Sequence, residues 1–149
     1  MSRSIMTDKA EILKYLMGGR ATITVLNTKT DTRYTYQVKA KRVDGKIRSC
    51  YTIKVMTGSD NVKDYTTLGY IPSVGKQTFR KFKDQVIGFD DVRSQGFSWL
   101  WNQLHSENPI PSTVQVWHEG SCSYCGRKLT VPSSISRGVG PDCWDKYCT

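Results

Sequence analysis

Three cysteines near the C-terminal end of the 149-residue sequence have the type and spacing of metal ligands. Cys122 and Cys125 are separated by two residues and followed by Gly126, which suits a tight turn that points two thiolates the same way. Cys143 follows after a stretch rich in turn-forming residues. The chain has five cysteines, an odd number, and in a reducing compartment this arrangement favours a metal over disulfide bonds. The sequence therefore predicts one structural Zn²⁺.

A closed tetrahedral zinc site needs a fourth ligand, and two residues compete for that role. His118 lies shortly before Cys122, at the end of an expected strand that leads into the cysteines. Cys148 follows Cys143 in an expected helix, about 140° around the helix axis from it, and it is the penultimate residue, where chain ends fray. On this geometry His118 is the predicted fourth ligand, and Cys148 is the alternative.

The residues between the second and third cysteines predict the shape of a small module. Residues 128–131 and 135–137 are expected to form two short arms joined through Pro132. Gly138, Gly140 and Pro141 then turn the chain so that Cys143 lies in the first turn of a helix. This arrangement predicts a treble-clef-like zinc-binding module.

The segment VWHEGSCSYCGRKLTVPSSISRGVGPDC, residues 116–143, resembles a small zinc-binding domain of unknown function in bacteriophage and prophage proteins. The shared pattern is Cys-x-x-Cys-Gly-Arg, then Leu-Thr-x-Pro-x-Ser-Ile, then Gly-x-Gly-Pro-x-Cys. Longer relatives also resemble YTIKVMTGSDNVKDYTTLGYI and the tryptophan-containing helix. Several relatives end soon after the third cysteine, which favours His118 as ligand, whereas this sequence departs from them by carrying Cys148. The resemblance implies a phage or mobile-element origin and no established activity.

The sequence does not contain a recognisable catalytic set. His118-Glu119 and the later Pro141-Asp142-Cys143 lack the spacings His-x-Glu and Pro-Cys-x-x-Cys of zinc deaminases. We find no phosphate-binding Gly-Lys-Ser/Thr loop, no nucleophile elbow and no carboxylate pair at a useful spacing. The sequence therefore predicts a protein that is not an enzyme.

The positive charge of the chain is concentrated before residue 110. The whole sequence has 22 Lys and Arg against 13 Asp and Glu, and residues 1–110 hold 18 and 10 of these. A face of this charge attracts anionic polymers such as nucleic acids. The candidate nucleic-acid-binding residues lie in one expected hairpin, with two more beside the cysteines: Lys39, Lys41, Arg42, Lys46, Arg48, Lys54, Arg127 and Arg137.

That hairpin is centred on Asp44-Gly45, because a two-residue type I′ turn needs positive φ at both positions. Counting outward from the turn pairs Val38 with Tyr51 and Tyr36 with Ile53, which places the apolar residues on one face. The other face carries the lysines, including Lys41 opposite Arg48. A register shift by one residue would mix the two sets.

The remaining patterns complete an α+β fold. We expect amphipathic helices after Asp8 and after Asp91, and strands over residues 21–25, 65–71 and 114–117. The prediction is an antiparallel β-sheet with two packed helices in residues 1–110, followed by the zinc-binding module in residues 111–149. No signal peptide or membrane span is visible, so the expected location is the bacterial host cytoplasm.

The sequence therefore predicts a non-catalytic, zinc-containing, nucleic-acid-binding protein of phage or prophage origin. The alternative is a phage effector that binds and inhibits a host protein, such as a defence system or a transcription factor. In that case the basic face would dock on an acidic or DNA-binding surface.

Overall fold

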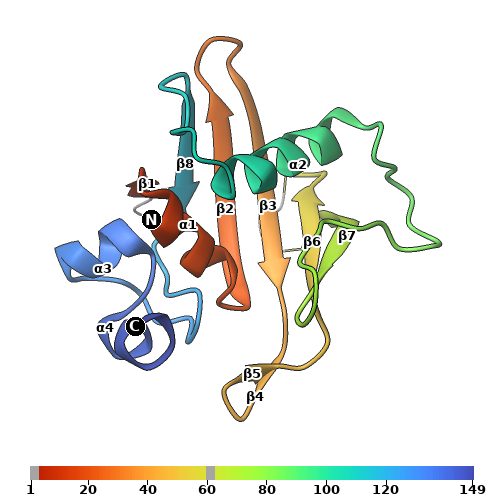
Figure 1. Cartoon of the computed structure of the whole chain (residues 1–149). Coiled ribbons are helices and arrows are strands. Elements are labelled where there is room, and N and C mark those ends of the chain that lie inside the picture. Colours follow the sequence, from red (N-terminus) through yellow and green to blue (C-terminus); the bar gives the residue numbers. More distant parts are fainter. Residues whose placement is uncertain (1–3, 60–62) are drawn as a thin grey trace.

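A six-stranded antiparallel sheet forms the body of the protein in the computed structural model, which describes residues 4–59 and 63–149 (Figure 1). The strand order is β1-β8-β2-β3-β6-β7. The strands are β1 Ser4–Met6, β2 Arg20–Asn27, β3 Thr32–Lys39, β6 Cys50–Met56, β7 Tyr65–Pro72 and β8 Val114–His118. The predicted α+β class with a mostly antiparallel sheet is confirmed.

Two helices, α1 Lys9–Leu16 and α2 Val92–Leu104, lie on the same face of this sheet (Figure 1). Both begin where the sequence predicts, because an aspartate caps each N-terminus. The Asp8 side chain accepts a hydrogen bond from the backbone N–H of Glu11, and the Asp91 side chain accepts one from that of Arg93. Such caps satisfy backbone donors that the first helical turn leaves free. Among the described residues, none of the helices has the length and apolar character that crossing a membrane requires.

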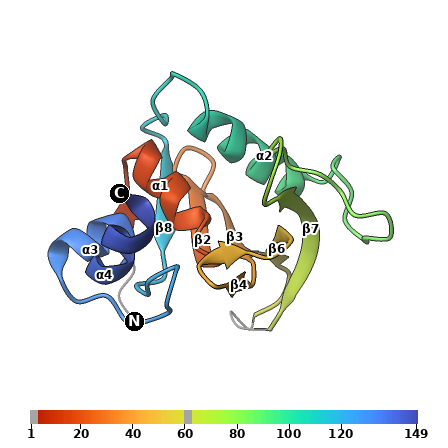
Figure 2. The same cartoon turned by 60° about the horizontal axis from the view of Figure 1, so that its bottom comes forward.

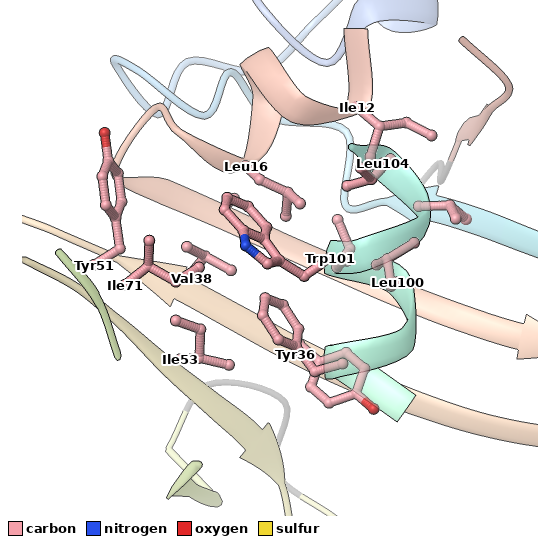
Figure 3. Packing of buried hydrophobic residues seen from close by; sticks show 14 of the residues in the cluster. Ile12, Leu16, Tyr36, Val38, Tyr51, Ile53, Ile71, Leu100, Trp101 and Leu104 are labelled. Carbon is pink, nitrogen blue, oxygen red and sulfur yellow. The ribbon is translucent and has the colours of Figure 1, made fainter. Parts of the chain in front are cut away.

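The hydrophobic core lies between the two helices and the inner face of the sheet (Figure 3). Phe97 is fully buried and lies edge-on to Tyr36, with 5.4 Å between the ring centroids. The alternation of β2, β3 and β6 places one set of side chains in this core and the next set on the opposite face. The labelled core residues in Figure 3 are Ile12, Leu16, Tyr36, Val38, Tyr51, Ile53, Ile71, Leu100, Trp101 and Leu104.

The predicted turn at Asp44-Gly45 is present, but the outer register of the hairpin differs from the prediction. Asp44 and Gly45 have φ values of 51° and 79°, and Val43 pairs with Lys46 between the short strands β4 Arg42–Val43 and β5 Lys46–Ile47. Further out, Tyr36 pairs with Val55 and Val38 with Ile53, a shift of two residues from the predicted pairs. A shift of two preserves the face of every side chain, so the apolar face is still buried.

The strand β8 belongs to the main sheet, although it lies in the predicted C-terminal module of residues 111–149. It lies between β1 and β2, where Val116 pairs with both Met6 and Val25. The chain after β8 gathers against α1 at one end of the sheet (Figure 2). This module is therefore joined to the sheet by the strand that leads into its cysteines.

The C-terminal module is more helical than the sequence predicts. It contains α3 Pro132–Arg137 and α4 Pro141–Cys143, and a π-helical turn Trp144–Cys148 follows. The expected second arm at residues 135–137 is therefore part of a helix, because Pro132 at its first position has the backbone angle that helix starts use. Cys143 lies in the short helix after Gly140 and Pro141, as expected.

Candidate metal centre

The structure brings Cys122, Cys125 and Cys143 together. Their sulfur atoms all lie within 4.8 Å of one another. Thiolates around a tetrahedral zinc ion are about 3.8 Å apart, as follows from Zn–S bonds of about 2.3 Å, so a small contraction closes the group around an ion. The three residues therefore fit the metal that the sequence predicts.

The knuckle between the first two cysteines has the backbone geometry of a metal-binding turn. The Gly126 N–H donates to the Cys122 carbonyl at 2.9 Å, and Gly126 has a φ of 82°, which favours glycine. The Tyr124 N–H points at the Cys122 sulfur, 3.4 Å away. Backbone donors of this kind stabilise a thiolate and orient it toward a metal.

The acid–base properties of the cysteines favour a bound cation. Burial opposes ionisation of Cys122, but backbone N–H groups of Gly140, Cys125 and Tyr124 together lower the pKa of its thiol. Burial, followed by the negative charge of Cys122, raises the pKa of Cys143 to about 12. Without a cation, the Cys143 thiol therefore resists the deprotonation that metal binding brings about.

His118, the predicted fourth ligand, is not a member of this group. The residue is fully buried, and both ring nitrogens already have backbone partners. Nδ1 accepts from the Gly120 N–H at 2.9 Å, and Nε2 lies 2.5 Å from the Ile135 carbonyl oxygen. In this structure His118 ties β8 to α3, and a different rotamer would have to break both bonds before it reached the cysteines.

Cys148, the alternative ligand, is also outside the group. Its thiol lies at the hydroxyl of Tyr124, whose pKa is raised by burial and by this neighbour. Its carbonyl accepts a hydrogen bond from Lys14 Nζ at 2.8 Å. Cys148 therefore anchors the C-terminal end on α1.

Arg42, predicted to contact nucleic acid, holds the module against the β4–β5 hairpin. Its guanidinium carbon lies 5.0 Å from the ring centroid of Tyr124 and 4.7 Å from that of Tyr147. The same group donates hydrogen bonds to the carbonyls of Met17, Gly18 and Gly45. Because the guanidinium group is engaged on several sides, Arg42 has a structural role here.

Arg137, another predicted contact residue, has a similar position at the other end of the module. Its guanidinium carbon is 4.3 Å from the Trp144 ring centroid, and Lys14 Nζ is 4.9 Å from the same ring. Cation–π contacts of this kind contribute about 0.5–2 kcal/mol each, depending on exposure. Arg137 of α3 and Lys14 of α1 thus hold the Trp144 ring of the C-terminal turn.

We expect Arg42→Gln to lower the free energy of unfolding by about 2 kcal/mol, since it removes cation–π contacts and charged hydrogen bonds. Urea denaturation followed by tryptophan fluorescence measures this loss. Lys46→Gln, which removes a charge from an exposed position in the same hairpin, is the matched control and should change stability by less than about 0.5 kcal/mol. Equal effects of the two substitutions would contradict the structural role of Arg42.

The outer face of the sheet carries every cation of the six strands. These cations are Arg20, Arg33, Lys39 and Lys54, and within the residues that the structure describes no strand of the sheet contains an aspartate or glutamate. Both α1 and α2 lie on the opposite face (Figures 1 and 2). Arg20 and Arg33 are not among the residues predicted from the sequence. Extending the alternation of side chains into the preceding hairpin would have found them, since Arg20 pairs with Lys39 there.

Three of the predicted nucleic-acid-binding residues share one hollow at the end of this outer face. Lys39, Lys41 and Lys54 line it together with Cys50 and Thr52, and its volume is about 500 Å³. Burial, and then the charge of Arg20, lowers the pKa of Lys39. An anion placed in the hollow would relieve this repulsion. The other predicted residues lie elsewhere: Lys46 and Arg48 are exposed in and beside β5, and Arg127 is exposed beside the cysteines.

Comparison with known proteins identifies a relationship for the C-terminal module. Residues 117–147 match a family of unknown function, DUF6011. The match spans the three clustered cysteines, His118 and the whole of α3. No curated protein and no solved structure matches the chain.

Proposed function

We propose that the chain is a non-catalytic nucleic-acid-binding protein whose outer sheet face contacts the phosphate backbone. The observation that carries this proposal is the charge of the sheet: in the described part of the chain its strands hold four cations on the face opposite the helices and no carboxylate. A solvated face without a partner usually mixes both signs of charge, because like charges on neighbouring strands repel. Arg20 directly opposite Lys39 is such a like-charge pair.

The shape of this face supports contact with a flexible anionic chain. The lysine-lined hollow lies at one end, and a second hollow lined by Thr24, Leu26, Arg33 and Trp117 lies on the same face. Trp117 is half-buried, with one ring edge held by Gln115 through a hydrogen bond from Nε1 at 3.1 Å. A positive surface with a partly exposed aromatic ring is typical of proteins that bind single strands by charge and base stacking.

The same proposal includes one structural Zn²⁺ per chain, bound at the clustered cysteines. Residues 117–147 form a small unit with a minor hydrophobic cluster, so a metal would contribute stability that the cluster alone does not provide. The resemblance of this unit to domains of phage and prophage proteins supports a phage or prophage origin, with action in the bacterial host cytoplasm. None of the chain's five cysteines, all of which the structure describes, is in a disulfide bond, in keeping with a reducing compartment.

Binding to oligonucleotides at several salt concentrations tests the proposal. We expect single-stranded DNA of random sequence to bind with an affinity that falls steeply as salt rises. About four phosphate contacts, one for each outer-face cation, predict a slope of log K against log salt near −3 for a single strand. Duplex DNA of equal length is the comparison, and weaker binding of the duplex would support base stacking beside Trp117.

The double substitution Lys39→Gln and Lys54→Gln should reduce the slope by about 1.4 and weaken binding at low salt. The matched control is Lys29→Gln with Lys83→Gln, which removes the same charge from two exposed residues outside the hollow. Equal losses in both double variants would show that only total charge matters. No binding of the wild-type protein at low salt would contradict the proposal and direct attention to a host protein as partner.

A further inference from the structure

A cavity of about 400 Å³ opens beside the three clustered cysteines. Cys125 is exposed and Cys143 is half-buried, and both residues line this cavity. The lining residues are Cys122, Cys125, Arg127, Lys128, Leu129, Thr130, Val131, Ser134, Gly140, Pro141, Asp142 and Cys143. A site that only stabilises the fold is usually closed by four protein ligands and has no such access.

No fourth protein ligand is present at this site among the described residues. Of their His, Cys, Asp and Glu side chains, only the three cysteines lie within mutual ligand distance. His118 has both ring nitrogens bound to backbone groups, and the Cys148 thiol lies at Tyr124. The two ligands that the sequence offers are thus held in other roles by the folded chain.

One buried polar group at the cavity has no partner within the chain. Ser134 is 1% exposed, and its hydroxyl has no hydrogen-bond partner. Leaving a buried hydroxyl unpaired costs about 1–3 kcal/mol, so such a group in a cavity wall indicates a ligand that it contacts. The neighbouring hydroxyls of Ser133 and Ser136 are on exposed residues and give no such indication.

We propose that three thiolates hold the metal and that its fourth coordination position takes an external thiol, which enters through this cavity. The proposal rests on the metal site of the proposed function but not on nucleic-acid binding. On binding, the thiol releases its proton to solvent and its sulfur joins the metal, with no change of oxidation state. The Ser134 hydroxyl then donates a hydrogen bond to the incoming ligand.

The chemistry of the site favours a thiol over a carboxylate. A metal already held by sulfur ligands prefers another soft ligand. Arg127 and Lys128 outnumber the single carboxylate of Asp142 in the cavity lining, which lowers the cost of bringing a further negative charge to a site with three thiolates. The apolar contacts of Leu129 and Pro141 suit a short alkyl chain.

Cobalt substitution tests the proposal with a spectroscopic readout. The protein is reduced with a phosphine, loaded with one equivalent of Co²⁺, and titrated separately with 2-mercaptoethanol, imidazole and acetate. We expect 2-mercaptoethanol to increase the thiolate-to-cobalt charge-transfer absorption by about one third, as three thiolates become four, and to shift the visible bands. Acetate should have little effect at the same concentration.

The outcomes separate this inference from the metal site itself. Two results would contradict an open fourth coordination position. One is a set of absorption bands that does not change with any of the three ligands, and the other is a charge-transfer band that loses about a quarter of its intensity in Cys148→Ser. A response to imidazole alone would overturn the thiol class. Absence of any charge-transfer absorption after loading would contradict the metal site as well.

Ser134→Ala tests the role of the buried hydroxyl. Removing an unpaired buried group should leave folding and cobalt binding intact, while affinity for 2-mercaptoethanol falls about threefold to tenfold, as expected for one lost hydrogen bond. Ser136→Ala, an exposed position of the same helix, should leave this affinity unchanged. Equal affinities of the two variants would show that Ser134 does not contact the ligand.

Discussion

Cys122→Ser is expected to leave less than about a tenth of an equivalent of zinc per chain, against one equivalent in the wild-type protein. Cys122 is the most buried of the three clustered cysteines, and its sulfur accepts a hydrogen bond from the backbone N–H of Tyr124. A serine hydroxyl stays protonated at neutral pH and does not replace a thiolate ligand. Elemental analysis of protein purified under reducing conditions measures the change.

The loss of metal should also loosen the C-terminal module. Structural zinc contributes apparent binding energies of about 10–16 kcal/mol in small fingers, which exceeds the stability of a unit of this size. Limited proteolysis of Cys122→Ser should therefore cut within residues 117–147 first, while the core between the sheet and α2 stays protected. Rapid cleavage throughout the chain would show that the sheet depends on the metal too.

Cys148→Ser and Cys50→Ser are the matched controls, because each removes one thiol outside the cluster. Both variants should keep one zinc. Loss of zinc from Cys148→Ser would restore Cys148 as the fourth ligand. Wild-type protein without metal, in which the clustered cysteines form disulfides in the native state, would contradict the metal centre altogether.

Local patterns allowed the sequence to predict much of the fold. The aspartate caps of α1 and α2 and the Asp44-Gly45 turn depend on neighbouring residues, and all three are present. The hairpin register was wrong by two residues beyond Lys41, because the second strand has three residues, Ser49 to Tyr51, where the first has only Ala40. Periodicity of two cannot detect such an insertion, since it leaves the faces unchanged.

The docking of the C-terminal module was beyond sequence reasoning, because it depends on contacts between distant segments. Arg42 stacks on Tyr147, and Lys14 binds the carbonyl of Cys148. From the sequence alone, Arg42 belongs to a basic hairpin, and nothing near it indicates an aromatic partner. The same limit applies to His118, whose spacing suits a zinc ligand but whose ring is held by the carbonyl of Ile135 in a helix that the sequence analysis did not predict.

Gly138→Ala is expected to lower the free energy of unfolding by about 3 kcal/mol. Gly138 ends α3 with a φ of 74°, where an L side chain costs about 1–2 kcal/mol. A Cβ atom there would also lie 2.4 Å from Cδ1 of Tyr15, a fully buried ring whose hydroxyl is bound to the Thr22 backbone. Overpacking of this kind adds about 1–3 kcal/mol, because the close-packed interior has no room for the ring to move.

Gly75→Ala separates the two contributions, because Gly75 has nearly the same backbone angle, a φ of 78°, and no atom within 4 Å of an added Cβ. It should cost only the backbone term of about 1 kcal/mol. Urea denaturation of both variants gives the difference, which measures the contact between the module and α1. Equal losses would mean that Gly138 does not lie against Tyr15 and that the module docks on the sheet in another way. A larger loss in Gly138→Ala, accompanied by weaker zinc retention, would show that the docked position of the chain before Cys143 also holds the third thiolate in place.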